Sequence, residues 1–169
     1  MKRFFIRMLL AMVALTSITD VFAQSDSDID NDYEAIIKQA VEEQSAECPM
    51  ELGEGMVMRD IYIANKRMVY DLQAPADILE VFESMLTLDK DAASTFFTES
   101  ILEGGDAVVF LFVFCVNANY GLEFRFSTPD SVKSINMVLS PEQLGKTISD
   151  KYNEEQLEEL ITNLLLENM

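Results

Sequence analysis

The segment Ala107–Val116 constrains the fold more than any other part of the chain. It contains ten consecutive residues without a charged side chain. Its Val and Phe content favours a strand, whereas its length exceeds the roughly four to eight residues of a typical buried strand and favours a helix. The residues alone leave both assignments open. Either assignment requires that the segment be buried, so the rest of the chain has to fold around it.

The composition agrees with a single domain built around such a core. The chain has 169 residues, of which 49% are hydrophobic, and only 2 Cys, 6 Gly and 4 Pro. These values exclude a collagen-like chain and a disulfide-dense miniprotein. The sequence contains no His. A Ser-His-Asp triad, a Cys-His dyad and every zinc site with a His ligand are therefore excluded.

The beginning of the chain has the pattern of an export signal. Three basic residues come first: Lys2, Arg3 and Arg7. The apolar stretch Met8–Leu15 follows, and Ala23 supplies the small residue that a signal peptidase requires. We predict a signal peptide over residues 1–23, cleavage between Ala23 and Gln24, and a periplasmic or extracellular location. The stretch is shorter than the about 20 residues that cross a bilayer. No later segment of the sequence is long and apolar enough to do so, and we therefore expect no membrane insertion after cleavage.

The net charge narrows the range of partners. The whole chain carries −18, and removal of residues 1–23 takes away three basic side chains and one acidic one, which leaves −20. Such a field repels phosphate backbones and anionic lipid surfaces. We therefore expect no nucleic-acid binding and predict that the partner is another envelope or extracellular protein. The oligomeric state stays open.

The predicted mature chain begins with an acidic, flexible leader over residues 24–30, followed by one domain over residues 31–169. Four aspartates alternate here in the manner of a calcium loop: Asp26, Asp28, Asp30 and Asp32. A calcium-binding loop that starts at Asp26 needs Gly at its sixth position and Glu at its twelfth, where this chain has Asn31 and Ile37. The frame from Asp28 fails in the same way. We predict no metal site.

The first half of the domain reads as a helix and a hairpin. Asn31 and Glu34 form a capping-box pattern, and the helix has to end before Pro49. Residues 59–72 alternate between apolar and polar side chains on both sides of Asn65, which tolerates the conformation of a tight turn. A β-hairpin is therefore predicted there.

The second half repeats this order. Two helical stripes lie between Pro75 and Gly104, and two strands are predicted over residues 122–126 and 132–139. Ser140 and Asn153 then cap two further helices. The resulting fold class is α+β, with a mainly antiparallel sheet formed by two β-hairpins and helices packed on one face.

A resemblance to a known group rests on two short patterns. Cys48-Pro49-Met50 is followed by a short acidic or Gly loop and the hairpin Met58–Leu72, and a later strand reads Asn119-x-Gly121-Leu122-x-Phe124-Arg125-Phe126. Over about residues 46–145 the chain resembles small exported bacterial proteins of unknown function that have a Cys-Pro segment followed by a β-hairpin. The resemblance implies a helix for Ala107–Val116. It implies no activity.

The residues favour a binding protein over an enzyme. No catalytic residue and no cofactor site can be selected among so many carboxylates, and Gly53-Glu54-Gly55 lacks the residues of a phosphate loop and is predicted to be a turn. We predict a protein-interaction module whose contact strand includes Arg59, Ile61 and Tyr62. The alternative is a small hydrolase of the cell envelope that works through carboxylates.

The two cysteines, Cys48 and Cys115, are a candidate disulfide. Export would place them where disulfides persist, and an even number of cysteines favours pairing. The alternative is that Cys115, which lies in the most apolar segment, is a small buried hydrophobic residue. The sequence leaves both possibilities open.

Overall fold

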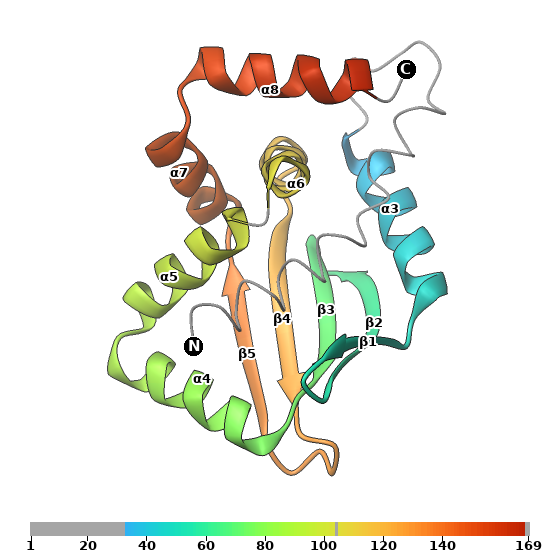
Figure 1. Ribbon diagram of the computed structural model, residues 1–169, viewed down its shortest axis with the longest axis vertical. Helices are drawn as coiled ribbons and strands as arrows, with labels where there is room; N and C mark the ends of the chain where they lie inside the picture. The colour runs from blue at the N-terminus through green and yellow to red at the C-terminus, as the bar shows by residue number, and fades with distance from the viewer. Residues whose placement is uncertain (1–32, 104, 168–169) are drawn as a thin grey trace.

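Five strands form one sheet in the order in which they follow each other along the chain (Figure 1). The computed structural model describes residues 33–103 and 105–167. The predicted signal peptide, its cleavage site, the acidic leader and the helix cap at Asn31 lie outside these residues. The strands are β1 (Met50–Gly53), β2 (Met56–Ala64), β3 (Arg67–Gln73), β4 (Gly121–Ser127) and β5 (Ser134–Leu139).

The described part of the chain contains six helices, and each predicted helix is present there. They are α3 (Tyr33–Glu47), α4 (Ala76–Leu88), α5 (Lys90–Leu102), α6 (Asp106–Asn117), α7 (Pro141–Lys151) and α8 (Glu154–Glu167). The uncharged run forms α6, as the resemblance implied. At the start of α7, Ser140 accepts a hydrogen bond from the backbone N–H of Gln143, and the Gln143 side chain accepts one from the Ser140 N–H.

The α+β class is confirmed, but the sheet is mixed. The two predicted hairpins exist as β2–β3 and β4–β5, each antiparallel. They are joined in the sheet through a parallel pairing of β3 with β4. Parallel neighbours need a long crossover between them, and the three helices α4, α5 and α6 supply it here.

Strand β1 was not predicted. It pairs antiparallel with the first part of β2, with Met50 opposite Met58. The predicted turn at Gly53-Glu54-Gly55 is confirmed, and all three residues have positive φ. The four residues of β1 were interpreted as a loop because their alternation is too short to be recognised.

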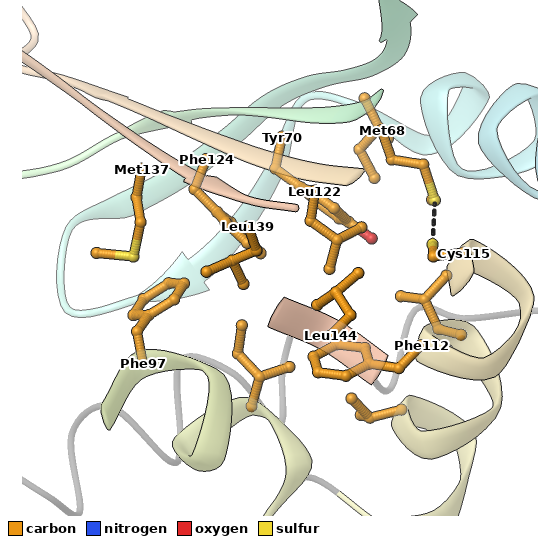
Figure 2. Close-up of a cluster of buried hydrophobic side chains, with 14 of the residues drawn as sticks. Met68, Tyr70, Phe97, Phe112, Cys115, Leu122, Phe124, Met137, Leu139 and Leu144 are labelled. Carbon is orange, nitrogen blue, oxygen red and sulfur yellow. Dashed lines mark hydrogen bonds between the residues drawn. The ribbon is translucent and has the colours of Figure 1, made fainter. Parts of the chain in front are cut away.

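Aromatic side chains from sheet and helices meet in the core (Figure 2). Tyr70 on β3 and Phe124 on β4 stack with ring centroids 5.0 Å apart. Phe97 of α5 meets Phe124 edge-on, also at 5.0 Å. Phe112 of α6 and Leu144 of α7 reach the same cluster. Alternation along the strands therefore defines a core face of the sheet, to which α5, α6 and α7 contribute side chains.

The candidate disulfide is not formed, because Cys48 and Cys115 are both free thiols. Cys115 is fully buried on α6 with its sulfur 3.8 Å from that of Met68, which is the alternative that the sequence left open (Figure 2). Burial raises the pKa of the Cys115 thiol to about 12. Cys48 follows α3 and its thiol contacts the carbonyl of Gln44 at 3.5 Å. No helix in the described residues is both long and apolar enough to cross a membrane.

Candidate interaction surface

The outer half of β2 is a sheet edge. Strand β1 pairs with β2 only as far as Met58, and within the described residues no strand continues this pairing along Asp60–Ala64. The chain enters β1 through Pro49, which has no N–H to donate to a ladder. In the part of the chain that the structure describes, no strand therefore lies in line with β1 beside the second half of β2.

Backbone groups at two positions of β2 point toward this edge. Asn65 and Lys66 form a two-residue turn with φ of 51° and 57°, so Ala64 and Arg67 are the hydrogen-bonded pair that closes the hairpin. Hydrogen-bonded and non-bonded pairs alternate along an antiparallel ladder. The N–H and C=O of Ile63 and of Ile61 therefore point away from β3.

The carboxylate of Asp60 protects one of these groups. Its Oδ1 accepts a hydrogen bond from the Ile61 N–H at 2.8 Å and a second from the Ser45 hydroxyl of α3 at 2.7 Å. Asp60 thus occupies the position that a neighbouring strand's carbonyl would take. Charged and capped edges of this kind prevent uncontrolled pairing between sheets.

A groove of about 500 Å³ lies between α3 and this edge, and we call it the α3–β2 groove. Its apolar lining comes from Val41 and Ala46 on α3 and from Ile61 and Ile63 on β2. Tyr62, between these two isoleucines on β2, also lines it. The charged residues of the groove are Lys38 and Glu42, both exposed on α3.

Tyr62 connects the groove to the sheet face opposite the core. Because successive side chains of a strand point to opposite faces, Tyr62 lies on the other face from Ile61. Its register neighbours are Val69 on β3 and then Glu123 on β4. The Tyr62 hydroxyl accepts a hydrogen bond from Arg125 at 2.8 Å, and the Arg125 guanidinium carbon lies 5.8 Å from the centre of the ring.

Arginines and carboxylates continue this contact across the sheet. Arg125 Nε donates to Glu123 Oε1 at 2.6 Å, and Arg67 donates to Glu123 Oε2 at 3.2 Å. Arg59 donates to both oxygens of Asp71 at 2.8 and 2.9 Å. All arginines of the described residues lie here, and we call this surface the arginine face: Arg59, Arg67 and Arg125.

Glu123 is the central residue of the arginine face. Its side chain is only 6% exposed, between two arginine side chains, of Arg67 and Arg125, that are each 40% exposed. The hydrogen bond from Arg125 lowers the pKa of Glu123, with a smaller contribution from Arg67, against the opposing effect of burial. The same contact raises the pKa of Arg125. Glu123 therefore stays ionised and holds both arginines in place.

The predicted contact strand is divided between the two faces. Arg59 lies on the arginine face, and Tyr62 contacts that face and lines the groove. The Ile61 side chain points into the core and is only 1% exposed, so it offers a partner little surface. Arg67 and Arg125 were not predicted as contact residues. The alternation of both residues with buried neighbours would have placed them on the same face as Tyr62.

The described residues also contain a polar cavity of about 360 Å³ between α5 and α7. Its lining includes Thr98, Glu99, Lys146 and Asp150, and the two last-named form an ion pair. Among residues 33–103 and 105–167, no three Cys, Asp or Glu side chains are grouped in a way that would hold a metal ion. The cavity has charged groups of both signs on its rim.

Comparison with known proteins identifies a solved structure with a similar fold. No family model matches the chain. No curated protein matches it either. A crystal structure of a protein from Pseudomonas aeruginosa, described as a candidate secreted protein, is similar with a TM-score of 0.51 and 12% sequence identity. The match covers 71% of this chain and 99% of that one, so the α+β arrangement is shared.

Proposed function

We propose that this protein is exported and acts as a non-enzymatic interaction module, which binds another envelope or extracellular protein through the surface around Tyr62. The basic and apolar start of the chain supports export, and the secreted description of the Pseudomonas protein agrees with it. Cleavage between Ala23 and Gln24 would release the mature protein.

The position of Tyr62 is the observation that carries the binding proposal. Tyr62 lines the α3–β2 groove, and its hydroxyl accepts a hydrogen bond from Arg125 of the arginine face. Tyrosine and arginine are the residue types that contribute most often to the energetic centre of protein interfaces. A ring that is already fixed in place loses little conformational freedom when a partner binds.

The experiment places a photo-cross-linking phenylalanine at Tyr62 and, as a control, at Ser149 on the exposed side of α7. Each protein is expressed with its own signal, and cells are irradiated. We expect a protein adduct of defined mass from position 62 and none from position 149. Equal labelling from the two positions, or no adduct from either, would contradict the proposal.

Purified protein should also leave glycan, ester and peptide substrates unchanged. Turnover that is lost when a single Asp or Glu is replaced would contradict the interaction module and support the alternative, a carboxylate-dependent hydrolase.

A further inference from the structure

Building on the proposed function, we propose that the α3–β2 groove binds an extended, basic segment of the partner, which pairs as a strand with the backbone of Ile63. The α3–β2 groove is thus the binding site, and the segment that occupies it is extended and basic. Addition of a strand to a sheet edge beside a helix is a general mode of peptide recognition.

The backbone of Ile63 offers a complete pairing site. Its N–H and C=O point toward the edge, because Ala64 and Arg67 form the pair that closes the hairpin. The Ile63 side chain points to the opposite face of the sheet from that of Tyr62, and both residues are half-buried. An extended segment alternates its side chains in the same way.

Asp60 limits the length of the pairing. Its carboxylate already accepts the Ile61 N–H, and the Ser45 hydroxyl holds it in that position. An incoming strand therefore pairs at Ile63, which is the last residue of β2 whose backbone N–H and C=O point toward the edge. The site is short, and affinity has to come from side chains in the groove as well as from the backbone.

The charge of the groove favours a basic segment. Lys38 pairs with Glu34, at 2.9 Å between Nζ and Oε1, and Glu34 also pairs with Lys66 through its other oxygen at 2.9 Å. Glu42 is exposed on the groove lining, and helix α3 as a whole carries four glutamates and one lysine. The complete chain, helix α3 included, has a net charge of −18. Complementary charge speeds association and excludes acidic competitors.

The first test separates backbone pairing from side-chain contact. The probe is a blocked, fluorescent peptide of alternating Lys and Val, and binding to the exported protein is followed by anisotropy. Ile63→Pro removes the outward N–H without removing a ladder bond to β3, whereas Ile63→Ala truncates the side chain and keeps the N–H. We expect Ile63→Pro to weaken binding about ten-fold and Ile63→Ala by about three-fold at most.

The second test addresses charge. Glu42→Lys should weaken binding of the Lys–Val peptide by about five-fold and improve binding of the matched Glu–Val peptide. Glu43→Lys makes the same change of charge one position along α3, outside the groove lining, and should have a much smaller effect.

The inference is overturned if the Lys–Val peptide does not bind, if Ile63→Pro and Ile63→Ala bind it equally, or if Glu42→Lys and Glu43→Lys have the same effect. Thermal unfolding of each variant shows that it is folded. The proposed function is judged separately by the cross-link at Tyr62. A cross-linked partner that still binds the Ile63→Pro protein would leave the interaction module in place and remove the groove as its site.

Discussion

The core face and the arginine face are formed by alternate residues of the same strands. On the core face, Tyr70 and Phe124 stack and are closed off by side chains from the helices. On the arginine face, Glu123 and Arg125 form charged hydrogen bonds at neighbouring positions of β4. Burial of aromatic rings contributes far more to folding than partly exposed ion pairs do. The stability of the fold therefore depends mainly on the core face. The side chains of the arginine face can differ without loss of the fold and are available to suit a partner.

The largest effect should come from the core face. Phe124→Ala removes a ring that packs against two others, and we expect a loss of about 3–5 kcal/mol in the free energy of unfolding. Val138→Ala is the matched truncation on the opposite face, at a residue that is 38% exposed, and should cost less than about 1 kcal/mol. Urea denaturation measures both. Similar losses would mean that the two faces do not differ as described.

Glu123 should have an intermediate effect, because it is the most buried charge of the arginine face. Glu123→Gln keeps the shape of the side chain and removes the charge that holds Arg67 and Arg125. We expect a loss of about 1–2 kcal/mol at neutral pH in urea denaturation. An unchanged or increased stability would show that the cost of burying the carboxylate exceeds the benefit of its hydrogen bonds.

The pH dependence of this difference gives an independent check. The pKa of Glu123 is lowered in the folded protein from an ordinary value of 4.5, so its stabilising effect is present above that value. The effect is lost as the pH falls through the lowered pKa. The difference between the native protein and Glu123→Gln should therefore shrink as urea denaturation is repeated from about pH 6 to below about pH 4. A difference that grows on acidification would contradict the assignment.

Gln44 is an exception on the core side of α3. It is 1% exposed, and both polar atoms of its side-chain amide lack a hydrogen-bond partner within residues 33–103 and 105–167. Gln44→Leu should therefore raise the free energy of unfolding by about 1 kcal/mol, while Gln44→Ala should not, since it leaves a cavity. Destabilisation by the Leu variant would show that the amide has a partner in solution.

The smallest effect should come from the rim of the arginine face. Arg59 pairs with Asp71, but its side chain is 42% exposed. Arg59→Ala should change the free energy of unfolding by less than about 1 kcal/mol, and added salt should remove most of the difference. A larger loss in the free energy of unfolding would show that Arg59 stabilises the fold and does not serve mainly as a surface residue for binding.

Sequence patterns that span only a few residues predicted the helices, turns and most strands correctly. The capping box at Ser140, the turn at Asn65 and the alternation in β4 each depend on residues close together in sequence. The parallel pairing of β3 with β4 is not local, because it depends on how three helices return the chain to the sheet. The length of that crossover was nevertheless a usable signal, since an antiparallel pair rarely needs one.

The surface that we propose for binding was selected only in part from the sequence, because several of its contacts join residues of different strands. Arg59 and Tyr62 were selected from one strand, and their partners Asp71 and Arg125 lie on the next two. The bulge between Met58 and Asp60 changes which side chains of β2 share a face. It could not be recognised from alternation alone. The burial of Glu123 also depends on arginines from two strands.

The most direct test of the account is the affinity of the cross-linked partner for the Tyr62→Ala protein, measured by calorimetry against the native protein. The account predicts a loss of at least about ten-fold, as expected for an aromatic residue at the centre of an interface. Because Tyr62 lies outside the core face, the variant should remain folded under the same conditions. Unchanged affinity in a folded Tyr62→Ala protein would contradict the claim that the partner binds through this surface.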